Sequence, residues 1–113
     1  MIKIKDINIS LEKDLFSKPD HNGESIYFLD KELQELYTGI LIETSGDIMI
    51  WWSEYIDGVQ NGVEKVFNNE GQLEQISKCK YNMHVGISKE YNEFNNLIFV
   101  GIKWNNGYVK ELY

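Results

Sequence analysis

The chain has 113 residues, a length typical of one domain that can bury a core of its own. Hydrophobic residues make up 42% of it, which argues against a disordered chain. Eighteen acidic and eleven basic residues give a net charge of −7. This charge disfavours nucleic acids and anionic membranes as partners and favours a basic protein, although solubility alone also accounts for it.

Cysteine content and the N-terminal sequence limit the compartment. Cys79 is the only cysteine, which excludes an internal disulfide and a cysteine metal cluster. The N-terminus lacks the charged and apolar segments of a signal peptide, and no apolar run approaches the roughly 20 residues of a membrane span. We therefore expect a soluble, cytoplasmic protein.

The N-terminal third, residues 1–36, reads as strands and loops. Alternating apolar and polar residues predict a half-buried strand over Met1–Ile9, with a bulge where the alternation slips by one residue. Ser10–Phe16 fits either one helical turn or a second strand. Lys18–Gly23 is predicted as a loop and Glu24–Leu29 as a short strand. Asp30–Tyr37 has helical spacing of its apolar residues, and we expect a connector with at most two helical turns there.

Three glycines at nearly equal spacing, Gly39, Gly62 and Gly86, mark a repeat with a period near 24 residues. Each is followed by an extended segment, a turn rich in Gly or Asn, a second extended segment and a further short turn. This pattern predicts successive β-hairpins, each of which has to bury its apolar face against neighbouring units. Val109–Tyr113 is long enough to add a final edge strand.

The second unit illustrates how the side chains should divide between the faces of the sheet. Period-2 alternation places Val63, Lys65 and Phe67 on one face and Glu64 and Val66 on the other. Turns are predicted at Ser45–Asp47, Asn68–Gly71, Tyr81–His84 and Asn92–Asn96.

These elements predict an all-β fold in which consecutive antiparallel β-hairpins form one curled sheet, with extra N-terminal strands and at most a short helix. Residues 1–113 are interpreted as a single domain. It consists of N-terminal strands and a connector (1–36), three hairpin repeats (37–107) and a C-terminal edge strand (108–113). Such a sheet should present a long concave surface without a deep pocket.

Several motifs of the repeat also carry a family resemblance. They are Tyr37-Thr-Gly39, Tyr55-Ile-Asp-Gly58, Gly62, Phe67-Asn-Asn-Glu-Gly71-Gln-Leu73, Tyr81, Gly86 and Glu90-Tyr91. Residues 37–107 thereby resemble a variant of the MORN repeat, whose usual unit combines a glycine, an aromatic residue, an Asn-Gly turn, a leucine and a Tyr-x-x-Gly turn. Bacterial proteins with this repeat are widely described as antitoxin or immunity-like components of toxin systems. The resemblance implies MORN-like hairpins and a role in bacterial competition such as contact-dependent growth inhibition.

The sequence offers no catalytic or metal-binding motif. Cys79 and His84 are close in sequence without a second histidine beside them, and His21 belongs to a different loop. A G-x-S-x-G motif is absent, and Gly58–Gly62 lacks the helix and the Lys-Ser/Thr of a phosphate-binding loop. Carboxylate pairs such as Glu70 and Glu74 fall in segments expected to be solvated. We therefore predict a protein that is not an enzyme and needs no metal or cofactor.

Adjacent tryptophans, Trp51 and Trp52, should point to opposite faces of their strand. Either both pack into the structure, or one of them is an exposed anchor for a partner, since Trp is enriched at the centres of interfaces. Acidic residues around such an anchor would complement a basic partner. The candidate partner-binding residues are Glu43, Asp47, Trp51, Glu54, Asp57, Glu64, Glu70 and Glu74.

Acidic charge, a sheet surface, the missing catalytic motifs and the family resemblance together favour an immunity or antitoxin protein. It would bind a cognate bacterial toxin, with a basic nuclease as one class that fits, and occlude the active site. The alternative is a MORN-like scaffolding or protein-interaction module without a toxin partner. A version of this module that binds a membrane surface is disfavoured, because acidic residues outnumber basic ones and a basic amphipathic segment is absent. We expect no nucleic acid, membrane or small-molecule substrate as a partner.

Overall fold

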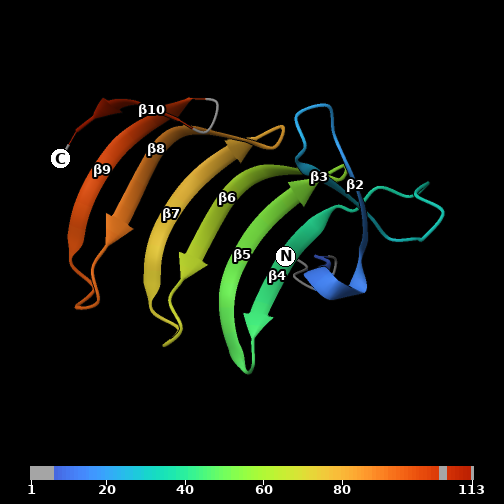
Figure 1. The fold of residues 1–113 in the computed structure, drawn as a ribbon, viewed down its shortest axis with the longest axis horizontal. Helices are drawn as coiled ribbons and strands as arrows, with labels where there is room; N and C mark the ends of the chain where they lie inside the picture. The colour runs from blue at the N-terminus through green and yellow to red at the C-terminus, as the bar shows by residue number, and fades with distance from the viewer. Residues whose placement is uncertain (1–6, 105–106, 113) are drawn as a thin grey trace, which may run out of the picture.

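A computed structural model describes residues 7–104 and 107–112, which form an eight-stranded sheet and a separate two-stranded hairpin (Figure 1). The strands of the large sheet, in spatial order, are β1 (Ile9–Leu11), β4 (Gly39–Ser45), β5 (Ile48–Ile56), β6 (Val59–Phe67), β7 (Leu73–Lys80), β8 (Met83–Tyr91), β9 (Leu97–Trp104) and β10 (Gly107–Glu111). From β4 to β10 each strand pairs antiparallel with the next, whereas β1 pairs parallel with β4. The predicted all-β class with one large, mainly antiparallel sheet is confirmed.

The N-terminal third differs in part from the sequence expectation. The strand predicted over Met1–Ile9 lies mostly outside the described residues, and β1 begins only at its last residue, Ile9. Ser10–Phe16 was predicted as either a helical turn or a strand, and it contains both. A single 3₁₀ turn, η2 (Glu12–Asp14), separates β1 from β2 (Phe16–Pro19). β2 pairs antiparallel with β3 (Ser25–Phe28). The loop predicted over Lys18–Gly23 therefore begins two residues later than expected, because Lys18 and Pro19 belong to β2.

Asp30–Tyr37 forms turns and no helix. The carboxylate of Asp30 accepts hydrogen bonds from the backbone N–H groups of Gln34 (3.0 Å) and Glu35 (2.9 Å), which a helix would need for its own ladder. Leu33 takes a φ of 58°, which reverses the chain, and Leu36 forms a bridge with Phe28. Local side-chain hydrogen bonding therefore overrides the helical spacing of the apolar residues.

Two of the tight turns share one backbone conformation. Asp57 and Gly58, between β5 and β6, have φ values of 47° and 83°. Tyr81 and Asn82, between β7 and β8, have φ values of 50° and 65°. Positive φ at both central residues is the signature of the type I′ turn, whose twist matches that of antiparallel strands.

Two of the three regularly spaced glycines, Gly62 and Gly86, occupy equivalent positions in their strands. Gly62 and Gly86 are the fourth residues of β6 and β8, and their φ values are 121° and 73°. Each faces a shift in strand register, between Ser53 and Tyr55 for the first and between Ile76 and Lys78 for the second. A bulge at a glycine bends a strand and increases its twist. The periodic glycines therefore correspond to backbone irregularities.

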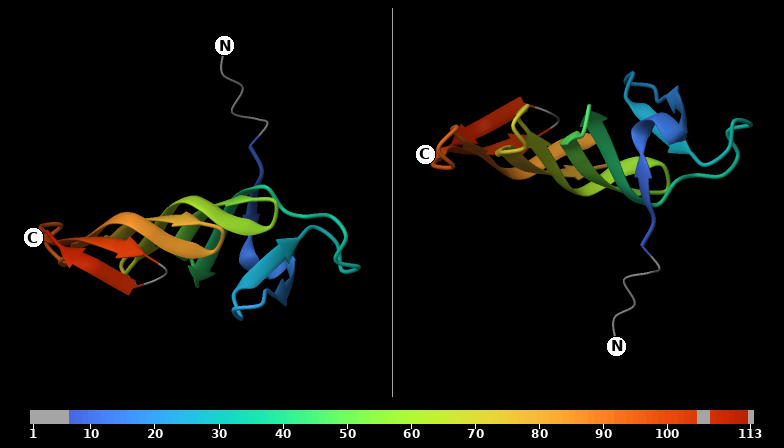
Figure 2. Two further views of the ribbon diagram at one scale, coloured as in Figure 1. Left: turned by 90° about the horizontal axis from the view of Figure 1, so that it is seen from above. Right: turned by 90° about the horizontal axis from the view of Figure 1, so that it is seen from below.

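A cluster of buried aromatic residues lies where the β2–β3 hairpin meets the large sheet. Tyr27, Tyr37, Leu41 and Tyr55 are buried, and the Tyr27 and Tyr55 rings meet edge to face at 5.4 Å. The backbone N–H of Tyr27 donates to Gly58 O (2.9 Å), and the N–H of Gly58 donates to Tyr37 O (2.8 Å). Figure 2 shows the hairpin lying against one face of the sheet near β4–β6, and this hydrogen bonding holds it there. Within the described residues, no helix has the length and hydropathy needed to cross a membrane.

Replacing Gly39 by alanine should destabilise the fold by about 3 kcal/mol, because strain and steric overlap coincide there. Gly39 has a φ of 152°, and an added Cβ would lie 2.5 Å from the backbone oxygen of Asn8 and 2.8 Å from the Tyr37 hydroxyl. Gly46 is the matched control, since its φ is also positive (61°) but no atom lies within 4 Å of its Cβ position.

Urea unfolding of G39A and G46A measures the difference. G46A should lose only about 1 kcal/mol, from backbone strain alone. Equal losses in the two variants would show that the close approach of β1 to the start of β4 does not contribute.

Candidate functional site

The face of the large sheet that the β2–β3 hairpin partly covers contains an open hollow of about 890 Å³. We call this face the hollow face. In its middle row Glu64 is flanked by two short side chains, because it pairs with Ser53 on one side and with Ser77 on the other. Ser88 pairs with Gly101 further along the same face. The hairpin and η2 add walls, so this face is hollowed where the sequence predicted no pocket.

Carboxylates surround the hollow. Glu12 from η2, Glu24 beside β3 and Glu43 from β4 line it, together with Glu64 on its floor. Lys103 from β9 also lines the hollow, where its ammonium lies 4.9 Å from the centre of the Tyr108 ring. The described carboxylates therefore outnumber the described lysines here, and the hollow has a negative field.

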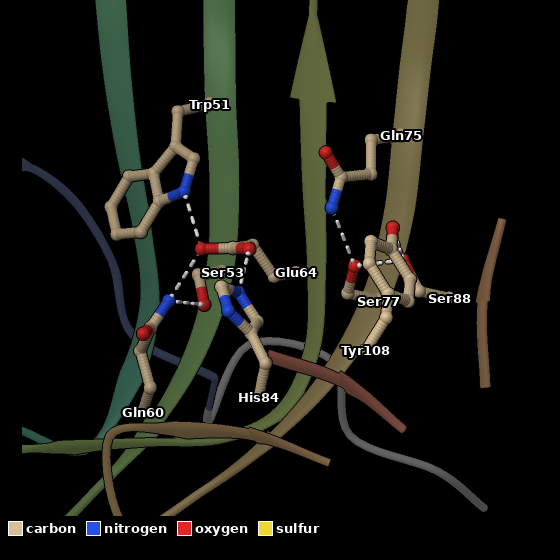
Figure 3. A network of polar contacts seen from close by, with 9 residues as sticks. All are labelled: Trp51, Ser53, Gln60, Glu64, Gln75, Ser77, His84, Ser88 and Tyr108. Atoms are coloured by element: carbon tan, nitrogen blue, oxygen red, sulfur yellow. Dashed lines mark hydrogen bonds and ion pairs between the residues drawn. The ribbon is translucent and has the colours of Figure 1, made fainter. Parts of the chain in front are cut away.

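Glu64 is buried, with 8% of its surface exposed, and its carboxylate is held by three side chains (Figure 3). The indole N–H of Trp51 (2.9 Å) and the amide of Gln60 (2.8 Å) both donate to Oε2. His84 Nε2 lies 2.6 Å from Oε1. Trp51 comes from β5, Gln60 from β6 and His84 from β8, so three strands converge on one carboxylate.

These contacts decide the charge state of Glu64. Burial alone would raise the pKa of its carboxyl group, but the hydrogen bonds from His84, Trp51 and Gln60 outweigh that effect and lower the pKa to about 2. Glu64 is therefore a permanently charged group on the floor of the hollow at neutral pH. A buried carboxylate with this many donors has a fixed orientation.

Cys79 lies beside Glu64 and His84 on β7, where it pairs in register with His84. Its thiol is buried, and burial, followed by the charge of Glu64, raises its pKa to about 12. The nearby ammonium of Lys103 acts in the opposite direction on the same pKa. Cys79 is therefore a protonated thiol at neutral pH, in contact range of a carboxylate and an imidazole.

A second polar network continues along the same face (Figure 3). The hydroxyls of Ser77 and Ser88 lie 2.8 Å apart, and the Gln75 amide donates to Ser77 Oγ at 3.0 Å. The Tyr108 hydroxyl donates to Glu90 at 2.7 Å. This network satisfies the buried hydroxyls in the middle row of the sheet and extends the polar floor towards β10.

The eight candidate residues from the sequence do not form one surface. Glu43, Trp51 and Glu64 line the hollow. Asp47, Asp57 and Glu70 lie in turns, at the ends of the hairpins. Strand alternation places Glu54 and Glu74 on the face opposite the hollow, where the Glu54 carboxylate accepts the backbone N–H of Val63 at 2.9 Å.

The two tryptophans point to opposite faces, as predicted. The Trp51 ring packs against Tyr55, with ring centres 6.2 Å apart, and faces the hollow. Trp52 lies on the other face, where the ammonium of Lys65 is 4.8 Å from the centre of its ring. Both are partly buried, so neither is a fully exposed anchor.

Three lysines gather on the face opposite the hollow, which also carries Glu54 and Glu74. Lys65, Lys78 and Lys89 lie on the face opposite the hollow, by the alternation of β6, β7 and β8. The carboxylates of Glu43 and Glu64 lie on the hollow face. The lysines therefore leave the acidic field of the hollow largely uncompensated.

Sequence reasoning missed Gln60, His84 and Lys103 as neighbours of Glu64. Only the register of β6, β7, β8 and β9 brings them together, and bulges at Ser53/Tyr55 and Ile76/Lys78 change that register. The one usable signal was the proximity of Cys79 and His84 across a two-residue turn, which makes them strand partners.

Comparisons with protein-family models, curated proteins and solved structures found no match to this chain. The resemblance to the MORN variant therefore rests on the sequence pattern alone.

Glu64 should make the free energy of unfolding depend on pH between about 4.5 and 2. Its folded-state pKa is about 2, below the ordinary value of 4.5, so its contribution is present above pH 4.5 and is lost as the pH falls towards 2. The shift corresponds to roughly 3 kcal/mol. Chemical denaturation of the wild type and of E64Q between pH 7 and 2 measures it.

The stability difference between wild type and E64Q should shrink across that window. E70Q is the control, because Glu70 is exposed in a turn and its removal should leave the wild-type profile unchanged. A difference between wild type and E64Q that is constant with pH would contradict a depressed pKa.

Proposed function

We propose that the chain is an immunity or antitoxin protein that captures a basic surface of a cognate bacterial toxin in its acidic hollow. The acidic hollow itself is the observation that carries this proposal. Glu24 and Glu43 are exposed at its walls, and the charged carboxylate of Glu64 lies on its floor. A net charge of −7 extends the attraction beyond the hollow.

The hollow is suited to a lysine or arginine side chain of the partner. An entering ammonium or guanidinium would meet the exposed carboxylates of Glu24 and Glu43, while the Trp51 ring offers an apolar wall for its methylene stem. Glu64 already accepts three hydrogen bonds, so it would contribute its charge more than a new contact. Lysines on the opposite face would repel the same partner and so orient the encounter.

A nuclease toxin fits this chemistry because its substrate groove is basic. An acidic protein that occupies the groove would exclude the nucleic acid without performing any reaction. Electrostatic steering would speed the association, which matters when a toxin has to be captured before it acts. The proposal includes a cytoplasmic location and a curled array of MORN-like hairpins, on the strength of the sequence pattern.

The second candidate is a scaffolding or protein-interaction module without a toxin partner. A shallow, mainly apolar groove of about 240 Å³ on the opposite face favours it. Val63, Ile76 and Ile87 line this groove beside Lys78 and Lys89. A partner bound there would contact a face that the toxin proposal leaves unused.

The proposal predicts that a gene beside this one encodes a toxin domain, and that co-expression with this chain restores growth of a host cell that produces the toxin. A double variant, E24Q/E43Q, should weaken the complex about tenfold or more, because it removes the exposed charges of the hollow while leaving its floor intact. The matched control is E70Q/E74Q, which removes the same charge from a turn and from the opposite face.

Affinity and association rate are to be measured over a salt series, in which binding should weaken steadily as ionic strength rises. Equal effects of the two double variants would place the interface elsewhere. A toxin that stays fully active with the protein in excess would exclude the immunity function.

A further inference from the structure

We propose that Glu64, Cys79 and His84 form a zinc-binding site on the floor of the hollow. The inference comes from the geometry of three neighbouring strands and does not depend on the proposed toxin partner. The sequence shows Cys79 and His84 close together but does not indicate Glu64 as a third ligand.

The backbone brings the three side chains together. Cys79 on β7 pairs in register with His84 on β8, and it pairs on its other side with Gly62, two residues before Glu64 on β6. One ligand atom from each of the three residues lies within 4.8 Å of the others. Tetrahedral zinc bonds of about 2.0–2.3 Å place ligand atoms about 3.5 Å apart, so side-chain movements of about 1 Å are needed. The Glu64 and His84 atoms, 2.6 Å apart, have to separate, and the more widely spaced ligand atoms have to approach. Glu64 and Cys79 are buried and His84 is partly buried, which separates this cluster from ordinary surface acidic groups.

The ligand types select the metal. A thiolate, an imidazole and a carboxylate together suit zinc, whereas calcium and magnesium prefer oxygen ligands alone. Three protein ligands with a fourth position open to water is a common zinc arrangement. Glu64 and His84 line the hollow, so water and the ion can reach the cluster from that side.

The surroundings orient the carboxylate for this role. Trp51 and Gln60 both donate to Oε2 of Glu64, and Oε1 is directed to His84. Oε2 is thus held by neighbouring donors while Oε1 becomes the ligand atom. Outer donors of this kind fix the orientation of metal ligands and influence affinity.

Charge and protons balance on binding. The thiol of Cys79 releases its proton to solvent. His84, which donates its Nε2–H to Glu64, shifts that proton to Nδ1 as the neutral imidazole changes tautomer, so that Nε2 and the Glu64 oxygen exchange their hydrogen bond for a bond each to the metal. Thiolate and carboxylate together neutralise a divalent ion, so the buried site carries no net charge. Lys103 lies close enough to influence the Cys79 thiol, and its ammonium is the described group that opposes the ion most directly.

Cobalt(II) titration of the full chain, freed of metal with a chelator, tests the site. Tetrahedral cobalt bound to a thiolate gives a near-ultraviolet charge-transfer band, and Cys79 is the only thiol in the chain. We expect this band at one equivalent of cobalt and its loss when zinc is added. C79S should abolish the band. Loss of an outer hydrogen-bond donor weakens metal binding about 10-fold, and H84A, which removes a ligand, should weaken zinc binding by more than that.

H21A is the matched control, because His21 is the other histidine of the chain, is exposed in the turn between β2 and β3 and does not belong to the cluster. It should bind as the wild type does. K103M should bind zinc more tightly, a gain that a purely structural role of the cluster would not produce. Circular dichroism checks the fold of each variant. W51F removes one hydrogen-bond donor to Glu64 and supplies an independent test, in which the affinity for zinc should fall about 10-fold.

Absence of the band in folded wild type, or a band that persists in C79S, would overturn the proposal. Equal losses in H21A and H84A would also overturn it, since binding would then be adventitious. A failed zinc titration leaves the toxin-binding experiments unaffected, because E24Q/E43Q changes neither the ligands nor their hydrogen-bond donors.

Discussion

The buried carboxylate of Glu64 is the constraint on which the hollow face depends. A charge removed from water is tolerated only when donors compensate it, and here Trp51, Gln60 and His84 supply them from three strands. Each donor is correctly placed only when β5, β6, β7 and β8 keep their register. Loss of the Glu64 carboxylate would leave polar atoms unpaired across the centre of the sheet. The network therefore specifies one arrangement of the strands. It also gives the hollow its fixed charge.

The division of residue types between the faces follows from the same arrangement. Ser53, Ser77 and Ser88 keep the middle of the hollow face low, and the β2–β3 hairpin packs beside it through Tyr27 and Tyr55. Apolar residues and lysines occupy the opposite face together with Glu54 and Glu74, and Lys103 is the described lysine that lines the hollow. Binding of a basic partner requires only this acidic hollow. The cluster of Glu64, Cys79 and His84 is a separate feature, which the proposed zinc site uses and which the charge pattern alone does not indicate.

Much of the fold could be predicted because hairpins depend on local signals. Turn residues and period-2 alternation indicated the antiparallel strands from Gly39 onward, and the Trp51–Trp52 pair was correctly divided between faces. The segment after Asp30 was harder, since side-chain hydrogen bonds replaced the helix that its spacing suggested. The site could be predicted only in part, because Glu43, Trp51 and Glu64 were candidates whereas Gln60, Cys79 and His84 were not. Its members meet only through strand register, and the bulges opposite Gly62 and Gly86 change that register in ways that alternation does not encode.

Direct observation of the Glu64 carboxyl carbon by ¹³C NMR, titrated with acid and assigned with E64Q, tests the central claim. The carboxylate of Glu64 should remain ionised at pH 4 and protonate only near pH 2. The Trp51 indole N–H signal should shift in the same titration, because it donates to that carboxylate. A Glu64 carboxyl group that titrates at or above the ordinary value of 4.5 would contradict the account, since the donors would then not compensate its burial.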